Sequence, residues 1–348
     1  MQIADRKIGP DQPPYIIAEL SANHNGSFEV ALRMIEAAKA TGVDAIKMQT
    51  YRPDTITLKS DRPEFCISGG LWDGRTLYDL YEEAHTPWDW HKPMFEHSRK
   101  LGITIFSSPF DRSAVDLLED LNAPAYKIAS FEAIDLPLIR YVASTGKPMI
   151  ISTGMANEKE IEEAGQAARD GGCDEFAFLH CVSGYPAPAS DYNLATIPDM
   201  VQRWGVPVGL SDHTLDNTTA IASVALGASV IEKHFTLDRS GGGPDDSFSL
   251  EPKEFAELCR CARVAWKSLG KANYARKSSE VQNAIFRRSL FVTRDVKAGE
   301  IITLDNLRSV RPGHGLPPAE LEALLGRKFA CDVNAATPMS WNLVDDDS

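Results

Sequence analysis

Short hydrophobic runs recur along most of the chain. Eight of them are nearly continuous, without alternation of apolar and polar residues, which is typical of strands buried on both faces of a parallel sheet. These runs are residues 15–19, 45–49, 103–107, 125–129, 148–152, 176–180, 206–210 and 230–234. We therefore predict eight parallel strands.

Amphipathic stretches with helical spacing separate most of these runs. Examples are residues 27–41, 113–121, 158–170 and 218–226. Gly42 and Gly102 each follow such a stretch, and glycine is a common signal for the end of a helix. Strands that alternate with helices define an α/β protein. The count of eight favours a (β/α)8 TIM barrel over the alternative, a doubly wound open sheet.

Two parts of the chain depart from this alternation. Residues 51–102 are longer than one helix requires and contain the sequence GLWDGRTLYDLYEEAHTPWDWH; long barrel loops usually shape the mouth of the active site. The polar, basic stretch 271–284 is interpreted as a linker. It separates a barrel domain, residues 1–270, from a small, mostly β domain, residues 285–348. A domain of about 60 residues is marginally stable alone, so we expect it to dock onto another surface.

The composition excludes several classes of protein. The chain has 348 residues, a net charge of −13, a pI near 5.1 and 43% hydrophobic residues, as globular proteins do. No run approaches the ~18 apolar residues that a membrane span requires, and the first residues lack the pattern of a signal peptide. An acidic chain is not expected to bind nucleic acid through a basic face. The six cysteines form no C-x-x-C pair, so we expect reduced thiols and a cytoplasmic location.

A polar residue stands at or just beyond the end of each predicted strand. The carboxyl ends of all eight strands meet at one end of a TIM barrel, where the active sites of such enzymes lie. These residues are therefore the candidate site. They include Glu19, Lys47, Gln49, Ser108, Lys127, Ser130, Glu132, Ser152, Ser183, Tyr185, Ser211, His213, Glu232 and His234.

Two of these residues form a matched pair of histidines. His213 and His234 follow or end the seventh and eighth strands, which are neighbours in a barrel. Two imidazoles on adjacent strand ends can bind one divalent cation such as Mn²⁺, Fe²⁺ or Zn²⁺. The alternative is that each ring bonds only to nearby backbone, and the pairing favours the metal.

Two lysines lie within otherwise apolar strands. Burying the ammonium groups of Lys47 and Lys127 is costly without an anionic partner. Together with the serines at the strand ends, they predict a cradle for a phosphate and a carboxylate. The competing interpretation is a lysine that forms a Schiff base.

A glycine-rich segment with two carboxylates follows the eighth strand. Residues 240–249 (SGGGPDDSFS) contain three glycines beside Asp245 and Asp246. We expect a mobile loop that folds over a ligand and whose carboxylates bind sugar hydroxyl groups. The alternative is a solvated acidic turn.

At these residues the sequence resembles a known family. The motifs IAELSANHNGS, DAIKMQTY, FSSPFD, YKIASFE, STGM, GLSDHT, IEKHF and SVRPGHGL occur in that order and together resemble the sialic acid (N-acetylneuraminate) synthase family. The resemblance covers nearly the whole chain, and the C-terminal part is similar to the antifreeze-like (SAF) domain of that family. The long stretch after the second strand resembles the pseudaminic acid synthase branch in particular. Ser183 departs from the asparagine usual in N-acetylneuraminate synthases, in agreement with a different sugar.

The resemblance implies a reaction. Phosphoenolpyruvate condenses with an open-chain amino-sugar aldehyde, through cleavage of its C–O bond, to give a nine-carbon 2-keto acid and phosphate. In the pseudaminic branch the sugar is 2,4-diacetamido-2,4,6-trideoxy-L-altrose. N-acetylneuraminate and legionaminate synthases use the same chemistry and are the alternatives. A Schiff-base aldolase and a sugar- or ice-binding module are less favoured.

The resemblance also implies roles for individual residues. His213 and His234 match metal ligands, with Mn²⁺ the expected ion and Mg²⁺ or Co²⁺ the alternatives. The positions that match phosphoenolpyruvate contacts are Lys47, Ser108, Lys127, Ser130, Ser152, Ser183 and Ser211. The sugar-side positions are Glu19, Gln49, Tyr185 and Asp245, and Glu19 is also a candidate for proton transfer. Arg311 matches an arginine contributed by the partner subunit, which implies a domain-swapped homodimer.

Overall fold

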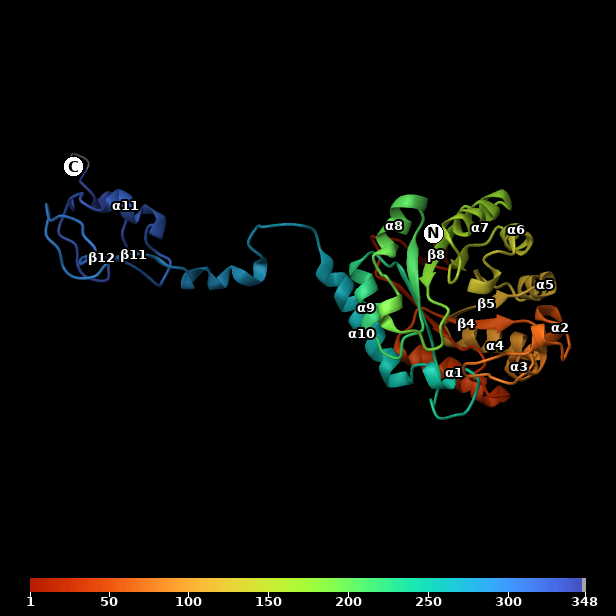
Figure 1. The fold of residues 1–348 in the computed structure, drawn as a ribbon. Coiled ribbons are helices and arrows are strands. Elements are labelled where there is room, and N and C mark those ends of the chain that lie inside the picture. The colour runs from red at the N-terminus through yellow and green to blue at the C-terminus, as the bar shows by residue number, and fades with distance from the viewer. Residues whose placement is uncertain (346–348) are drawn as a thin grey trace. The chain divides into compact units, whose positions relative to one another are not determined.

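A computed structural model describes residues 1–345 of the chain (Figure 1). The chain divides after Gly270 into two units, Met1–Gly270 and Lys271–Ser348. Each unit has its own buried core. All six cysteines are free. Among residues 1–345, no helix is both long and apolar enough to cross a membrane.

Eight parallel strands form a closed barrel in the first unit. Their order follows the sequence, and the last strand pairs with the first, so that His234 lies beside Glu19. The predicted TIM barrel is therefore confirmed, and the open-sheet alternative is wrong. The strands are β3 (Tyr15–Glu19), β4 (Ala45–Thr50), β5 (Thr104–Pro109), β6 (Tyr126–Ile128), β7 (Met149–Ser152), β8 (Phe176–Cys181), β9 (Val208–Asp212) and β10 (Val230–His234).

Amphipathic helices bury their apolar faces against the outside of the strands. Ser27 begins α1 by accepting a hydrogen bond from the amide of Val30, and Gly42 ends it with a φ of 88°, a left-handed conformation that favours glycine. The helices are α1 (Phe28–Thr41), α4 (Trp88–Leu101), α5 (Arg112–Asp120), α6 (Leu136–Ala143), α7 (Glu158–Asp170), α8 (Thr196–Trp204), α9 (Thr218–Ala225) and α10 (Pro252–Leu269), with the 3₁₀ turns η2 (Ser130–Glu132), η3 (Ala189–Asp191) and η4 (Asp246–Phe248).

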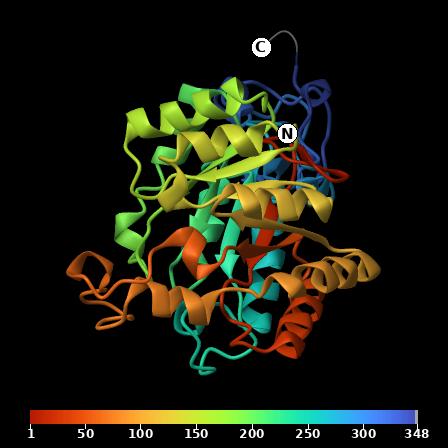
Figure 2. The ribbon, with the colours of Figure 1, turned by 90° about the vertical axis from the view of Figure 1, so that its right-hand side faces the viewer.

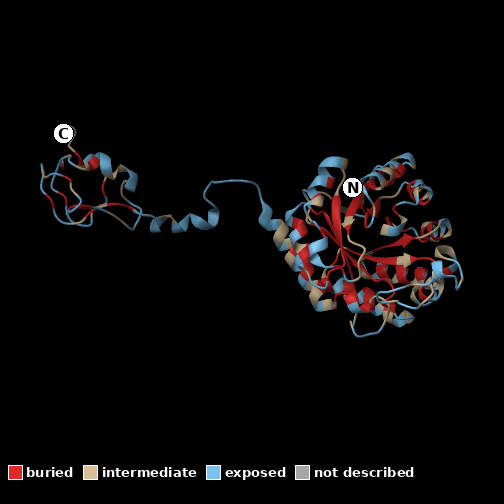
Figure 3. Cartoon of the chain, viewed as in Figure 1, coloured by how far each residue is buried: buried red, intermediate tan, exposed pale blue. Residues whose placement is uncertain are grey.

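An apolar layer closes the amino-terminal end of the barrel interior. Inward side chains such as Tyr15 and Phe106 form this layer, and Ile3 packs against it from the hairpin of β1 (Gln2–Ile3) and β2 (Arg6–Lys7). Figure 3 shows the buried strands at the centre of the unit. Because side chains alternate along a strand, the next inward positions lie nearer the carboxyl end, and most of these are polar.

The connection from β4 to α4, residues 51–87, is the long stretch noted in the sequence, and we call it the insertion. It projects from the barrel (orange in Figure 2). At its two ends, Trp88 Nε1 donates to the Tyr51 carbonyl at 3.1 Å, and the Thr86 hydroxyl lies 3.2 Å from His24 Nε2. The insertion contains α2 (Pro53–Ile56), η1 (Pro63–Phe65) and α3 (Leu77–Ala84).

The C-terminal unit is built from short strands and isolated β-bridges. Its two strands pair antiparallel, and bridges such as that between Val296 and Val333 extend the pairing. A small apolar core includes Leu290 and Phe329. The elements are β11 (Ser289–Val292), β12 (Leu307–Val310), α11 (Leu321–Leu324), η5 (Ser278–Glu280), η6 (Gln282–Phe286), η7 (Pro318–Glu320) and η8 (Trp341–Leu343).

Candidate active site

A cavity of about 540 Å³ lies at the carboxyl end of the barrel strands. Twelve of the fourteen binding or catalytic residues predicted from the sequence line it. They are Glu19, Lys47, Gln49, Lys127, Ser130, Ser152, Ser183, Tyr185, Ser211, His213, His234 and Asp245. The two exceptions are Ser108, which is buried on β5 beside Gln49, and Arg311, which is exposed in the C-terminal unit.

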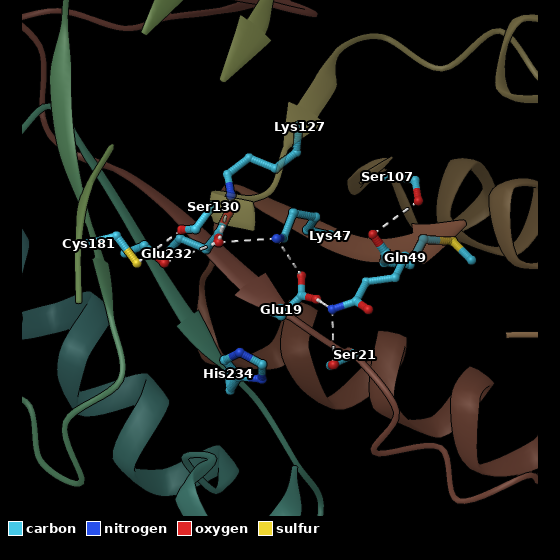
Figure 4. Close-up of polar contacts among 12 residues, drawn as sticks. Glu19, Ser21, Lys47, Gln49, Ser107, Lys127, Ser130, Cys181, Glu232 and His234 are labelled. Carbon is cyan, nitrogen blue, oxygen red and sulfur yellow. Dashed lines mark hydrogen bonds and ion pairs between the residues drawn. The ribbon is translucent and has the colours of Figure 1, made fainter. Parts of the chain in front are cut away.

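Four charged side chains form an ion-pair network on the floor of the cavity (Figure 4). Lys47 Nζ lies 3.1 Å from Glu19 Oε2 and 3.1 Å from Glu232 Oε1, and Lys127 Nζ lies 3.2 Å from the same Glu232 oxygen. All four side chains are buried. They come from inward positions on β3, β4, β6 and β10, so closure of the barrel is what brings them together.

Burial and mutual contacts shift the pKa values within this network. Burial alone would favour the neutral carboxyl, but the two lysines lower the pKa of Glu232 to about 2. The pKa of Glu19 is raised, because burial and the Glu232 carboxylate outweigh the Lys47 ammonium. Burial also lowers the pKa of Lys127, against the attraction of Glu232. Two buried lysines beside these carboxyl groups make the floor suited to an anionic ligand.

Buried hydroxyl groups without partners lie on the same strand ends. The side-chain oxygens of Ser108, Ser152 and Ser183 have no hydrogen-bond partner among residues 1–345, whereas buried polar groups are nearly always bonded. Gly154 keeps space open here, because a Cβ at this position would lie 2.7 Å from Ser130 Oγ and would overlap Ser183 Oγ. The Gly154 amide donates to Ser130 Oγ at 3.2 Å. The unpaired hydroxyl groups match the oxygens of a phosphate or a carboxylate.

The two histidines lie at the ends of neighbouring strands, with ring centroids 5.5 Å apart. His213 Nδ1 lies 2.8 Å from the Val182 carbonyl, to which it donates. His234 Nδ1 is buried and has no hydrogen-bond partner within the described part of the chain. Burial and the nearby His213 hold the pKa of His234 well below its usual value, so this ring is neutral and able to bind a cation. Burial would do the same to His213, but the hydrogen bond and charge interaction with Cys181 raise its pKa.

The two imidazoles fit a divalent cation whose other ligands come from elsewhere. A histidine whose Nδ1 donates to a backbone carbonyl is oriented as metal-bound histidines usually are. In residues 1–345, no group of three or more His, Cys, Asp and Glu side chains is arranged to hold an ion. A cation held by His213 and His234 would therefore complete its coordination with substrate oxygens and water.

A second chain of polar contacts links the predicted sugar-side residues. Gln49 donates to Glu19 at 2.9 Å and to Ser21 at 3.1 Å, and the Ser21 hydroxyl bonds in turn to Asp245. Tyr185 lies against His213, with ring centroids 4.4 Å apart. These contacts run from the charged floor toward the loop after β10.

Asp246 has a structural role. It is buried, and its carboxylate accepts hydrogen bonds from the Thr236 hydroxyl, the Asn25 amide and the Gly243 backbone. The acidic pair of the glycine-rich loop is therefore divided. Asp246 holds the loop, and Asp245 lines the cavity.

Glu132 and Glu232 are among the strand-end residues predicted from the sequence, but their roles emerge only from the structure. Glu232 binds both lysines. Glu132 lines the cavity with one buried carboxylate oxygen unpartnered among residues 1–345, and burial raises its pKa to about 7. The insertion adds apolar side chains to the cavity. The sequence does not show which of its residues do so, because this depends on how the insertion packs against the barrel.

The fold and the cavity define a TIM-barrel enzyme with an anion site at the carboxyl ends of its strands. The NeuB family model matches residues 34–274, and the chain belongs to this family. The SAF domain model matches residues 287–345. The family and the SAF domain predicted from the sequence motifs are therefore confirmed.

Named relatives resemble the chain over nearly its whole length. The pseudaminic acid synthase of Campylobacter jejuni is 45% identical over 333 residues, covering 96% of this chain and 96% of the relative. The pseudaminic acid synthase of Helicobacter pylori is 42% identical over 330 residues, covering 94% of this chain and 97% of the relative. The crystal structure of N-acetylneuraminic acid (sialic acid) synthetase from Leptospira borgpetersenii in complex with citrate matches with a TM-score of 0.73 and 32% identity, covering 81% of this chain and 94% of that one.

Proposed function

We propose that the protein is a pseudaminic acid synthase, which condenses phosphoenolpyruvate with 2,4-diacetamido-2,4,6-trideoxy-L-altrose and releases phosphate. The observation that carries this proposal is the floor of the cavity, which contains two buried lysines and the unpaired hydroxyl groups of Ser152 and Ser183, with Gly154 leaving space beside Ser183. The relatives named pseudaminic acid synthase support the choice of sugar.

The lysines and serines would hold phosphoenolpyruvate on the floor. Lys47 and Lys127 neutralise its carboxylate and phosphate, and Glu232 keeps both ammonium groups in position. Such charge-assisted hydrogen bonds are about twice as strong as neutral ones. The hydroxyl groups that donate to the remaining oxygens are those of Ser108, Ser130, Ser152, Ser183 and Ser211.

The condensation requires three proton transfers. C3 of phosphoenolpyruvate bonds to the aldehyde carbon and the aldehyde oxygen gains a proton; water then adds at C2 with loss of a proton. Finally the C2 hydroxyl group gives its proton to the leaving phosphate as the C–O bond breaks and the 2-keto group forms. We assign the first two transfers to Glu132 and Glu19, which line the cavity and both have raised pKa values. A pKa of about 7 at Glu132 suits general acid–base catalysis near neutral pH.

We propose that His213 and His234 bind Mn²⁺, with Mg²⁺ or Co²⁺ as alternatives. A cation bound there would polarise the sugar aldehyde. The unpartnered Nδ1 of His234 and the oriented ring of His213 support this site. Tyr185 packs against His213, and Asp245 Oδ2 lies 4.0 Å from His234 Nδ1, so both side chains are placed to orient the sugar.

We also propose a homodimer in which the C-terminal unit of each copy covers the barrel mouth of the other and supplies Arg311. Large exposed apolar side chains on the loops after β6, β7 and β9 support a covered mouth, because removing them from water would be favourable. They are Phe131, Ile134, Met155 and Leu215, each at least 54% exposed.

Mixed dimers test this arrangement. A chain with Lys127→Ala and a chain with Arg311→Ala should each be inactive alone. If Arg311 acts on the other barrel, half of the dimers in an equal mixture carry one intact site of two, so co-expression should restore about a quarter of the wild-type activity. Recovery of none of the activity would contradict the swapped arrangement.

A phosphate-release panel tests the reaction itself. Purified protein is given phosphoenolpyruvate with 2,4-diacetamido-2,4,6-trideoxy-L-altrose, with its mannose-configured counterpart or with N-acetylmannosamine. We expect the first sugar to give the highest kcat/KM. Borohydride should trap no lysine adduct, and a trapped adduct would instead support an aldolase.

A further inference from the structure

The cavity has two unlike halves. The floor carries the ion-pair network and the unpaired hydroxyl groups described above. The other half is apolar, and we call it the apolar wall. The insertion supplies most of it, with Ile56, Ile67, Trp72, Leu77, Leu80, Tyr81 and Ala84, and Phe110 after β5 extends it.

Contacts on more than one side hold the apolar wall in place. Trp72 Nε1 donates to the Pro244 carbonyl at 3.3 Å, and its ring centroid lies 6.2 Å from that of Tyr185. Tyr81 packs edge-on against Tyr51, with centroids 5.7 Å apart. The wall is therefore connected both to the loop that carries Asp245 and to the end of β4.

The charged residues of the insertion do not contribute to the cavity. Residues 51–87 contain eleven Asp, Glu, Lys and Arg residues, and none of them lines it. Arg75, for example, pairs with Glu83 at 2.6 Å. Among the wall side chains only Trp72 and Tyr81 carry polar atoms, and Trp72 Nε1 is already bonded. A sugar hydroxyl placed here would exchange its hydrogen bonds to water for one side-chain partner at most, the Tyr81 hydroxyl, whereas a methyl group would gain from burial.

The chemistry of the floor decides which end of the sugar reaches the wall. The aldehyde carbon has to meet C3 of phosphoenolpyruvate, which the lysines hold, and its oxygen has to lie near His213 and His234. The rest of the sugar then extends away from the floor. In the sugar of the proposed reaction, this distal end carries a C6 methyl group and the methyl of the acetamido group at C4.

We propose, resting on the proposed function, that the apolar wall is the specificity subsite for the distal methyl groups of the sugar. It favours sugars with a methyl group at C6 over sugars that carry a hydroxyl group on this carbon. Apolar subsites discriminate between such groups by about 10- to 100-fold in kcat/KM. The insertion therefore determines which amino sugar is condensed, while the floor determines that phosphoenolpyruvate is the partner.

The test compares phosphate release from phosphoenolpyruvate with two sugars, 2,4-diacetamido-2,4,6-trideoxy-L-altrose and its 6-hydroxylated counterpart. Leu80→Ala and Ile67→Ala remove part of the wall in the full-length protein. Leu71→Ala is the matched control, because Leu71 belongs to the insertion but is 54% exposed and does not line the cavity. Circular dichroism verifies that each variant is folded.

We expect the wild type to prefer the deoxygenated sugar by about tenfold or more. Both wall variants should reduce this preference by at least about threefold, through a higher KM for the deoxygenated sugar and with an unchanged KM for phosphoenolpyruvate. The control should keep the wild-type preference. Ile67 is only half-buried, so its replacement should disturb folding less. If Leu80→Ala fails to fold, the sugar preference of Ile67→Ala tests the proposal.

Results of two kinds, with the wild type or with the variants, would overturn the proposal while leaving the proposed function intact. One is equal turnover of the two sugars by the wild type. The other is an unchanged preference in folded wall variants, or an equal loss of preference in Leu71→Ala. No phosphate release with either sugar would refute the proposed function itself, and the specificity subsite with it.

Discussion

Gly154 lies beside the hydroxyl groups of Ser130 and Ser183, and its lack of a side chain keeps that space free. In Gly154→Ala, the new methyl group would overlap Ser183 Oγ and lie 2.7 Å from Ser130 Oγ. We expect KM for phosphoenolpyruvate to rise by about tenfold or more and the free energy of unfolding to fall by about 1–3 kcal/mol. Phosphate-release kinetics and thermal unfolding measure the two effects. Gly9→Ala is the control, since a Cβ there meets nothing within 4 Å, and an equal KM in both variants would contradict the cradle.

Glu132 makes the stability of the barrel depend on pH. Burial raises its pKa from 4.5 to about 7, so the folded state favours the neutral acid, and the stability that this provides is lost as the pH rises through 7. At pH 8 the buried carboxylate destabilises the folded state by roughly 3 kcal/mol at most. We expect Glu132→Gln to unfold at a higher temperature than the wild type at pH 8, with the difference shrinking toward pH 4.5. Calorimetry measures the difference in melting temperature between variant and wild type. Glu82→Gln, at an exposed position, is the control, and the same pH-dependent rise in its melting temperature would contradict the raised pKa of Glu132.

At the residue scale, the sequence predicts what a strand position alone can show. Lys47 and Lys127 are recognisable because each interrupts an apolar strand, and such a charge needs a partner. Glu132 is named as a strand-end candidate, but its raised pKa could not be predicted, because it lies in a 3₁₀ turn and its surroundings depend on side chains from other parts of the chain. Ser108 is predicted to contact the ligand and lies on the correct face of β5, yet it is buried below the cavity surface.

At the scale of elements, one ion pair joins β9 to β10 beyond their backbone hydrogen bonds. Lys233 Nζ lies 2.7 Å from Asp212 Oδ2 and 2.6 Å from the Thr214 carbonyl, and the paired side chains are at most 1% exposed. His213 follows Asp212 and His234 follows Lys233, so this pair sets the spacing of the two imidazoles.

Lys233→Met would leave the Asp212 carboxylate buried without its partner. We expect the free energy of unfolding to fall by about 3–5 kcal/mol, and calorimetry should show weaker binding of Mn²⁺. Lys297→Met is the matched control: Lys297 pairs with Asp332 at 2.7 Å, but both side chains are mostly exposed, so the change should stay within about 1 kcal/mol. If both variants lost a similar free energy of unfolding, burial of the Lys233–Asp212 pair would not increase its contribution to stability.

The strands are predicted to within two residues. The predicted run 206–210 becomes β9 at Val208–Asp212, and the run 103–107 becomes β5 at Thr104–Pro109. At both carboxyl ends the backbone pairing continues through polar residues beyond the predicted run, such as Asp212 and Ser108, where hydrophobicity no longer marks a strand. The apolar wall could not be predicted in this way, because its side chains come together only through tertiary contacts such as that of Trp72 with Tyr185.

At the scale of the whole molecule, a net charge of −13 would repel phosphoenolpyruvate unless positive charge were concentrated locally. Lys47 and Lys127 provide part of that charge, and a cation at the two histidines would add to it. We expect EDTA to abolish phosphate release and Mn²⁺ to restore it. Full activity after complete removal of metal would contradict the assignment.

The apolar layer that includes Tyr15 and Phe106 has a kinetic consequence. It closes the amino-terminal end of the barrel, so the cavity has no exit through the floor, and both substrates and both products share one passage. Phosphoenolpyruvate has to bind before the sugar that lies above it. Phosphate can leave only after the nine-carbon acid has moved out of its way. For the proposed reaction, this shape imposes a compulsory order of binding and release, in which excess sugar inhibits by occupying the passage first.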